Sequence, residues 1–212
     1  MTAAPLELWG GAECTVNRVG DRTYDQLERT GHATRLDDLD RFAAMGLKTL
    51  RVALVWERIE TSPGVFDWTW ADAYMGRLKR LGVRPIVGLI HHGSGPRWTD
   101  LTQASFVAGL AAHAARVVAR YPWVTDWTPV NEPLTTARFS CLYALWHPHQ
   151  RDEHAFWAAL LIQIEATAAA MREIRRVQPA ARLIQTEDYG WTDATAPCTT
   201  QAAFENNRPK HG

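Results

Sequence analysis

The chain has 212 residues, a length that suits one domain, and its hydrophobic and charged contents of 46% and 22% are those of an ordinary globular protein. Its 23 basic and 23 acidic side chains balance to a formal net charge of zero. This balance, without a local Lys/Arg cluster, argues against a nucleic-acid partner.

Two further features bear on location. The amino terminus lacks the basic and apolar regions of a signal peptide, and no apolar stretch approaches the roughly 20 residues that span a bilayer. Cys14, Cys141 and Cys198 are odd in number and widely spaced, which fits neither a disulfide framework nor a metal site. We therefore expect reduced thiols in a cytoplasmic protein, with no membrane association, metal or cofactor.

Strand-like and helix-like segments alternate along the chain. Apolar, β-rich runs predict strands, and apolar residues at helical spacing predict helices, several of which are followed by Gly or Pro. Residues 21–34 are polar and irregular, so we expect a long loop there. The expected strands are 6–14, 48–56, 83–90, 124–130 and 181–187, and the expected helices are 35–45, 70–81, 105–121 and 153–177.

Five strands with a helix in each interval predict a parallel sheet with right-handed crossovers. An open doubly wound sheet and a closed (β/α)8 TIM barrel share this pattern. The barrel is favoured because no glycine-rich phosphate fingerprint follows the first strand, and because polar or aromatic residues follow every strand. These residues are Glu13 and Asn17, Trp56 and Glu57, His91 and His92, Asn131 and Glu132, and Glu187 and Asp188.

A complete barrel needs eight strands and roughly 250 residues. The sequence supplies five strands. We therefore interpret residues 1–199 as the amino-terminal five-eighths of a barrel and residues 200–212 as the start of a helix and a polar tail.

The segment Trp127-Thr128-Pro129-Val130-Asn131-Glu132-Pro133 places an amide and a carboxylic acid at the end of the fourth strand. In an extended strand, Asn131 and Glu132 would point to opposite sides. They can serve one site only where the strand ends or bulges. A carboxylic acid among amide, His and aromatic side chains suggests glycoside chemistry, which needs one carboxyl to protonate the leaving oxygen and a second carboxylate.

This segment resembles the Asn-Glu-Pro motif of family 1 glycoside hydrolases, the β-glucosidase-like retaining enzymes. Three other segments agree with that family in order and spacing, and together the resemblance covers residues 6 to about 207. They are Leu8-Trp9-Gly10-Gly11-Ala12, the segment from Leu50 to Ile59 (LRVALVWERI), and the segment from Gly88 to Pro96 (GLIHHGSGP).

The resemblance implies roles for individual residues. Glu132 would be the general acid/base, and Asn131 would bind the sugar 2-hydroxyl. Arg51 would lie on the barrel floor and keep the nucleophile ionised, and His92 would contact a sugar hydroxyl. Two further positions complete the set: Trp127 below the acid/base, and Asn17 in place of a sugar-binding Gln. Structural alternatives stay open: Arg51 as a buried ion-pair residue, and His91 and His92 as loop residues.

The chain also departs from the family pattern. The nucleophile segment of the family, a Glu on the seventh strand, is absent from these residues, so we expect no turnover from this chain alone. Glu187 ends the fifth strand and is a weak candidate for catalysis. Gly93-Ser94-Gly95 replaces bulkier residues after the third strand, which predicts a different pocket.

Two other functions compete with a β-glycosidase. The segments CTVNR, HHGSGP and PVNEPLTTARFS resemble a bacterial subgroup often joined to a nucleotide-sugar reductase of the dTDP-4-dehydrorhamnose reductase type, which implies a non-catalytic sugar-recognising barrel with such a partner. An unrelated barrel enzyme, such as an aldolase, would need a strand-end Lys or a phosphate loop, and no good candidate for either is present.

Overall fold

The computed structural model describes residues 6–188, whose core is a five-stranded parallel sheet. The strand order is β1-β4-β7-β8-β9, which is the order along the chain. The strands are β1 (Trp9–Gly11), β4 (Thr49–Ala53), β7 (Arg84–His91), β8 (Asp126–Asn131) and β9 (Arg182–Leu183). This arrangement confirms the parallel sheet of the barrel prediction, and the predicted tail at 200–212 lies outside the described residues.

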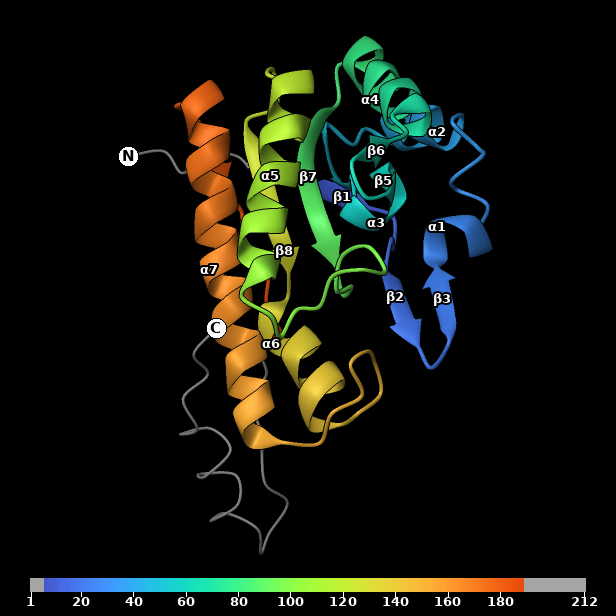
Figure 1. The fold of residues 1–212 in the computed structure, drawn as a ribbon. Helices are drawn as coiled ribbons and strands as arrows, with labels where there is room; N and C mark the ends of the chain where they lie inside the picture. Colours follow the sequence, from blue (N-terminus) through green and yellow to red (C-terminus); the bar gives the residue numbers. More distant parts are fainter. Residues whose placement is uncertain (1–5, 189–212) are drawn as a thin grey trace, which may run out of the picture.

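Each interval of the sheet contains the helix that was predicted for it. They are α2 (Asp38–Ala44), α4 (Thr69–Leu81), α5 (Ser105–Arg120) and α7 (Glu153–Val177). In the view of Figure 1, α5 and α7 lie side by side to the left of β7, and the small β2–β3 hairpin lies to its right. The carboxyl-terminal end of α4 follows from the sequence, because Gly82 after it adopts the left-handed conformation with φ 66°.

The predicted loop at residues 21–34 is wrong in its first half. Strands β2 (Val16–Val19) and β3 (Arg22–Asp25) form an antiparallel hairpin that leads into α1 (Gln26–Arg29). Gly20, with φ 57°, and Asp21 form the two-residue connection. A Gly-Asp pair is a hairpin signal, but the flanking residues are too polar to stand out as strands.

Five other short elements have no counterpart among the predicted ones. They are α3 (Trp56–Ile59) with the β5–β6 hairpin (Glu60–Ser62, Val65–Phe66), the short helix α6 (Pro133–Ala137) and the π-helix η1 (Arg138–Leu142). The first group lies between the carboxyl end of β4 and α4, and the other two lie between the carboxyl end of β8 and α7. They build the loops at the edge of the sheet where α/β barrels hold their sites.

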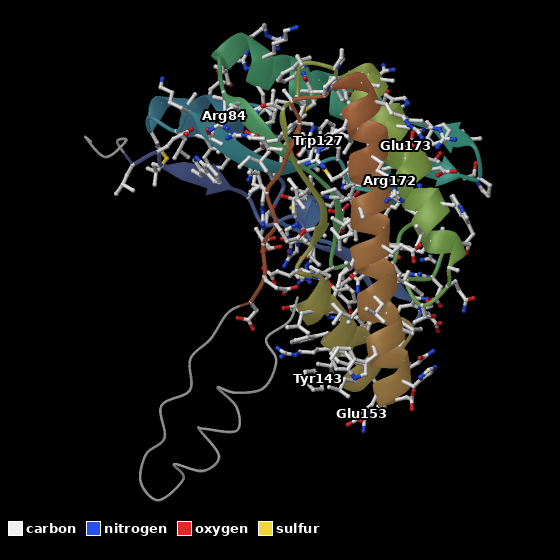
Figure 2. All side chains as sticks on the ribbon, turned by 90° about the vertical axis from the view of Figure 1, so that its left-hand side faces the viewer. Arg84, Trp127, Tyr143, Glu153, Arg172 and Glu173 are labelled. Carbon is white, nitrogen blue, oxygen red and sulfur yellow. The ribbon has the colours of Figure 1, made fainter. Side chains whose placement is uncertain are left out.

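Helix α7 is long and apolar enough to cross a membrane by length and composition alone. It packs against α5 and β8, and its Phe156, Leu160 and Ile174 side chains are buried. Figure 2 shows Arg172 and Glu173 along the same helix and Glu153 at its start. A helix with one face in the core and charges on another is an amphipathic core helix.

A buried carboxylate joins three strands at the amino-terminal edge of the sheet. Asp126 is fully buried, and Arg182 donates to its two oxygens at 2.7 and 2.9 Å. Arg84 on β7 binds the same carboxylate. This triad connects β7, β8 and β9 at the edge opposite to Asn131 and Glu132.

We predict that Asp126→Asn lowers the free energy of unfolding by about 2 kcal/mol, because it leaves two arginines without their buried counter-charge. This is below the cost of breaking a fully buried pair, since Arg84 and Arg182 are 32% and 59% exposed. Asp72→Asn is the matched control, because Asp72 pairs with Arg120 on the surface and such pairs contribute about 1 kcal/mol or less. Urea denaturation measures both, and equal losses would contradict the role given to Asp126.

Candidate active site

Two neighbouring strands end side by side and place four of the predicted polar residues together. In the register of β7 and β8, His91 lies opposite Asn131. The residues that follow these two strand ends, His92 and Glu132, have positive φ angles of 60° and 45°, respectively. Such angles are disfavoured for residues other than glycine, and they turn the backbone sharply at the end of each strand. Asn131 and Glu132 therefore escape the opposed directions of an extended strand.

A hydrogen-bond network holds Asn131 and His92 in place. The Asn131 Nδ2 donates to His92 Nε2 at 3.1 Å, and the Asn131 Oδ1 accepts from the Thr186 hydroxyl at 2.9 Å. His92 Nδ1 lies 3.0 Å from the Thr136 hydroxyl. Since Nε2 accepts, Nδ1 carries the proton and donates to Thr136.

His92 is neutral at physiological pH. Burial, together with the neighbouring His91, lowers its pKa from 6.5 to about 4. Its Nε2 lies 3.7 Å from the Glu132 Oε2, and the Glu132 side chain is 29% exposed. The cluster thus offers one accessible carboxyl group beside a buried amide and a neutral imidazole.

His91 belongs to a different set of contacts. Its Nε2 lies 3.2 Å from Glu13 Oε1, and its Nδ1 lies 3.2 Å from the Cys14 sulfur. The hydrogen bond from His91 lowers the pKa of Glu13, and burial raises that of the Cys14 thiol to about 12. His91 therefore connects β7 to the loop after β1.

Arg51 lies on β4, whose register places it opposite Gly11 and Ile86. Its side chain is half-buried and makes no ion pair with a carboxylate of residues 6–188. The alternative of an ordinary buried ion pair thus finds no partner in this part of the chain. Trp127 is fully buried within β8, and its indole N–H has no hydrogen-bond partner among the described residues.

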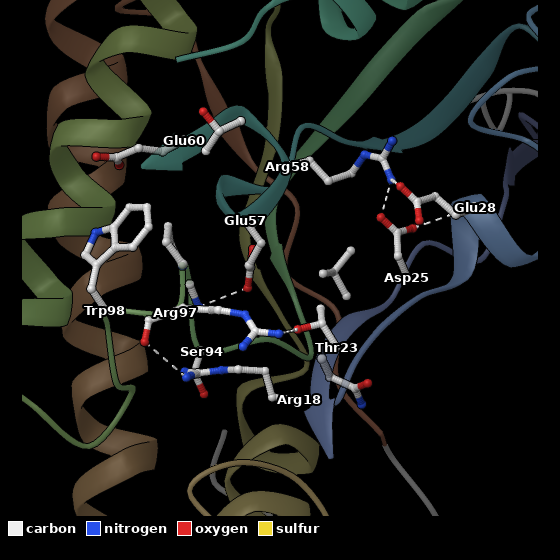
Figure 3. Close-up of a pocket in the computed structure, with 15 residues that line it drawn as sticks. Arg18, Thr23, Asp25, Glu28, Glu57, Arg58, Glu60, Ser94, Arg97 and Trp98 are labelled. Carbon is white, nitrogen blue, oxygen red and sulfur yellow. Dashed lines mark hydrogen bonds and ion pairs between the residues drawn. The ribbon is translucent and has the colours of Figure 1, made fainter. Parts of the chain in front are cut away.

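The structure places Asn17 apart from Asn131 and Glu132. It lies on β2 and lines a cavity of about 410 Å³ between the β2–β3 hairpin, α3 and the loop after β7. Figure 3 shows this cavity, with Glu57 inside it and Arg18 and Arg97 at its wall. Neither Asn131 nor Glu132 is among the lining residues.

Glu57 occupies the room that the small residues of the loop after β7 leave. Its Oε1 accepts the Gly95 N–H at 2.9 Å, and its Oε2 is buried without a partner among the described residues. A Cβ on Gly93 would lie 2.0 Å from Glu57 Oε1 and 2.5 Å from the Val16 carbonyl oxygen. The small residues of the Gly93-Ser94-Gly95 segment therefore leave the space that the Glu57 carboxyl group needs.

Glu187, in the segment after β9, contacts the turn that follows β8. Its Oε1 accepts the Leu134 N–H at 2.7 Å, immediately after Glu132 and Pro133. Burial raises its pKa, and the negative charge of Glu132 raises it further. The sequence indicates Glu187 as a strand-end residue but carries no signal for this contact, because it joins residues that are 53 positions apart. No group of three or more metal-binding side chains occurs within residues 6–188.

Comparison with known proteins gives one family. The family model described as glycosyl hydrolase family 1 matches residues 17–208. A 6-phospho-beta-glucosidase of Dickeya chrysanthemi is 26% identical over 163 residues, which cover 69% of this chain and 33% of that protein.

Solved structures agree in fold. An AHE enzyme of Alicyclobacillus herbarius matches with a TM-score of 0.73 at 21% identity, covering 83% of this chain and 43% of the other. A family 1 β-glucosidase of Thermotoga maritima matches with a TM-score of 0.71 at 20% identity, covering 84% and 43%. The chain thus spans less than half the length of these relatives.

We predict that Glu57→Gln becomes more stable than the parent chain as the pH rises. Burial raises the Glu57 pKa from 4.5 to about 7. A folded pKa above the unfolded value means that the stabilisation is present below pH 4.5 and is lost as the pH rises through 7. Ionisation of the buried group then costs about 2–3 kcal/mol between pH 5 and pH 8. Gln keeps the acceptor for Gly95 and cannot ionise.

Thermal or urea unfolding of both proteins at pH 5 and pH 8 measures this difference. Glu28→Gln is the control, because the Glu28 side chain lines the same cavity but is 69% exposed. A stability gain that does not depend on pH, or an equal gain in the control, would contradict the enclosure of Glu57.

Proposed function

The chain belongs to glycosyl hydrolase family 1, and from this membership we propose that it provides the acid/base half of a retaining β-glycosidase, with Glu132 as the general acid/base. The observation that supports this most is the accessible Glu132 carboxyl group at the end of β8, beside the buried Asn131 amide. A glycoside hydrolase needs such a group to protonate the leaving oxygen and then to deprotonate water.

In this proposal, Asn131 binds the sugar hydroxyl adjacent to the cleaved bond. Its Oδ1 and one Nδ2 hydrogen are engaged by Thr186 and His92, which leaves the second Nδ2 hydrogen to donate to substrate. The neutral imidazole of His92 holds this amide and lies beside Glu132. Arg51 is available to a second carboxylate, because its guanidinium has no carboxylate partner in residues 6–188.

A retaining mechanism needs that second carboxylate about 5 Å from the first, on the opposite face of the sugar bond. Glu187 is a poor nucleophile, since its Oε1 is bound to the Leu134 N–H and its Oε2 to the Asp188 N–H at 3.2 Å. The proposed role of this chain is therefore sugar binding and acid/base chemistry. The buried thiols of Cys14 and Cys141 are in keeping with a cytoplasmic location, which we propose as well. No feature of residues 6–188 favours the reductase-linked barrel.

We predict that the purified 212-residue chain does not hydrolyse 4-nitrophenyl β-D-glucoside above the background of its Glu132→Gln variant. Release of 4-nitrophenolate measures this. Hydrolysis by the parent chain that disappears in both Glu132→Gln and Glu187→Gln would contradict the assignment of one catalytic carboxyl.

When a longer chain supplies the second carboxylate, Glu132→Gln should act according to the leaving group. Hydrolysis of an alkyl β-glucoside, whose leaving oxygen must be protonated, should fall by about 100-fold or more. Formation of the glycosyl-enzyme from 2,4-dinitrophenyl β-glucoside should fall far less, because that leaving group departs unprotonated. Stopped-flow release of 2,4-dinitrophenolate separates this step from the later attack of water, and equal losses for both substrates would exclude Glu132 as the acid.

A further inference from the structure

Glu132 begins helix α6 without using its side chain to cap it. It is the N-cap residue, with φ 45° and ψ 66°, and its carboxylate accepts no hydrogen bond from the first turn. An N-cap side chain usually accepts such a bond, since the first N–H groups of a helix have no partner within the helix. A carboxyl group reserved for proton transfer has to leave that place to another acceptor.

Glu187 supplies the missing acceptor from the segment after β9. Its Oε1 lies 2.7 Å from the Leu134 nitrogen, the second residue of α6. The two residues before it bind the same stretch in order. Gln185 Nε2 donates to the Val130 carbonyl oxygen at 3.1 Å, and Thr186 donates to Asn131 Oδ1 at 2.9 Å.

The resulting contacts run in parallel along two segments. Residues 185, 186 and 187 bind residues 130, 131 and 134, so both sides of the Asn131-Glu132-Pro133 turn are held. The left-handed Glu132 lies between the two held residues. Its disfavoured backbone persists only where its surroundings fix it, and these hydrogen bonds do so.

We propose that Glu187 is a positioning residue for Glu132. The Glu187 carboxylate caps α6 in place of the Glu132 side chain, and this leaves the Glu132 carboxyl group free to face the substrate. The proposal rests on the proposed function for the word substrate, but the capping contact itself does not. Glu187 touches no reacting atom and acts through the backbone of Leu134.

The contact should report the ionisation of Glu187 directly. Burial, and then the charge of Glu132, raise the Glu187 pKa above its ordinary value of 4.5. A protonated carboxyl group accepts more weakly, so the Leu134 amide should titrate with Glu187. The charged groups that line the surrounding groove are Asp188 beside it and Arg172 and Arg175 of α7, and His92 stays neutral above about pH 4.

The test is NMR on the isotope-labelled 212-residue chain, with the Leu134 amide as the probe. In the parent chain, its shift should titrate with a midpoint above 4.5. In Glu187→Gln, the titration should vanish while the amide stays protected, because Gln keeps an acceptor. In Glu187→Ala, its hydrogen exchange should accelerate about tenfold, the loss of one such hydrogen bond, and the resonances of Glu132 should shift.

Glu173→Ala is the matched control, because Glu173 pairs with Arg176 on α7 and should leave Leu134 unchanged. A Leu134 amide that does not titrate in the parent chain, or that exchanges equally fast in the parent and Glu187→Ala, overturns the proposal. If Glu187→Ala does not fold, the titration of the parent chain and of Glu187→Gln decides.

Covalent labelling of Glu187 by a 2-fluoroglucoside would show that Glu187 is a nucleophile, and this result would overturn the positioning role. A parent chain that binds no sugar would count against the proposed function alone, because the Leu134 titration does not require a ligand.

Discussion

The pairing of β7 with β8 is the constraint on which the site depends. Parallel hydrogen bonding places His91 opposite Asn131, so the two strands end at the same level. After each strand, the backbone turns at a residue in the left-handed conformation, His92 after β7 and Glu132 after β8. A shift of this register by one residue would reverse the side on which Asn131 points and would break its contact with His92. The buried Asp126 triad at the other edge of the sheet opposes such a shift.

The larger elements could be predicted because their signals are local. Helix α7 begins at Glu153 and ends at Val177 as expected, since apolar periodicity and Pro179 define it. The proximity of His92, Asn131 and Glu132 also followed, because the ends of parallel strands meet at one edge. The β2–β3 hairpin escaped prediction, since its pairing depends on tertiary contacts that polar residues do not reveal.

Other parts of the site depend on distances that only the folded chain defines. From the sequence, Glu57 was only one of the residues that follow the second strand, yet its carboxyl group is enclosed under the loop of Gly93 and Gly95. Asn17 followed the first strand in sequence but lines the cavity of Glu57. From the sequence, Glu187 was a strand-end carboxylate and a weak candidate for catalysis. Its hydrogen bond with Leu134 joins the segment after β9 to helix α6, and no pattern within either segment predicts this contact.

The central claim is that Asn131 and Glu132 form a sugar-binding site that is already organised in this chain. An iminosugar tests it most directly, because its ammonium group pairs with a carboxylate and its hydroxyl groups bind amides. In an NMR titration, we expect the resonances of His92, Asn131 and Glu132 to shift together, and Asn131→Ala to abolish the effect. Shifts confined to the cavity around Glu57, or binding that is unchanged in Asn131→Ala, would contradict the account.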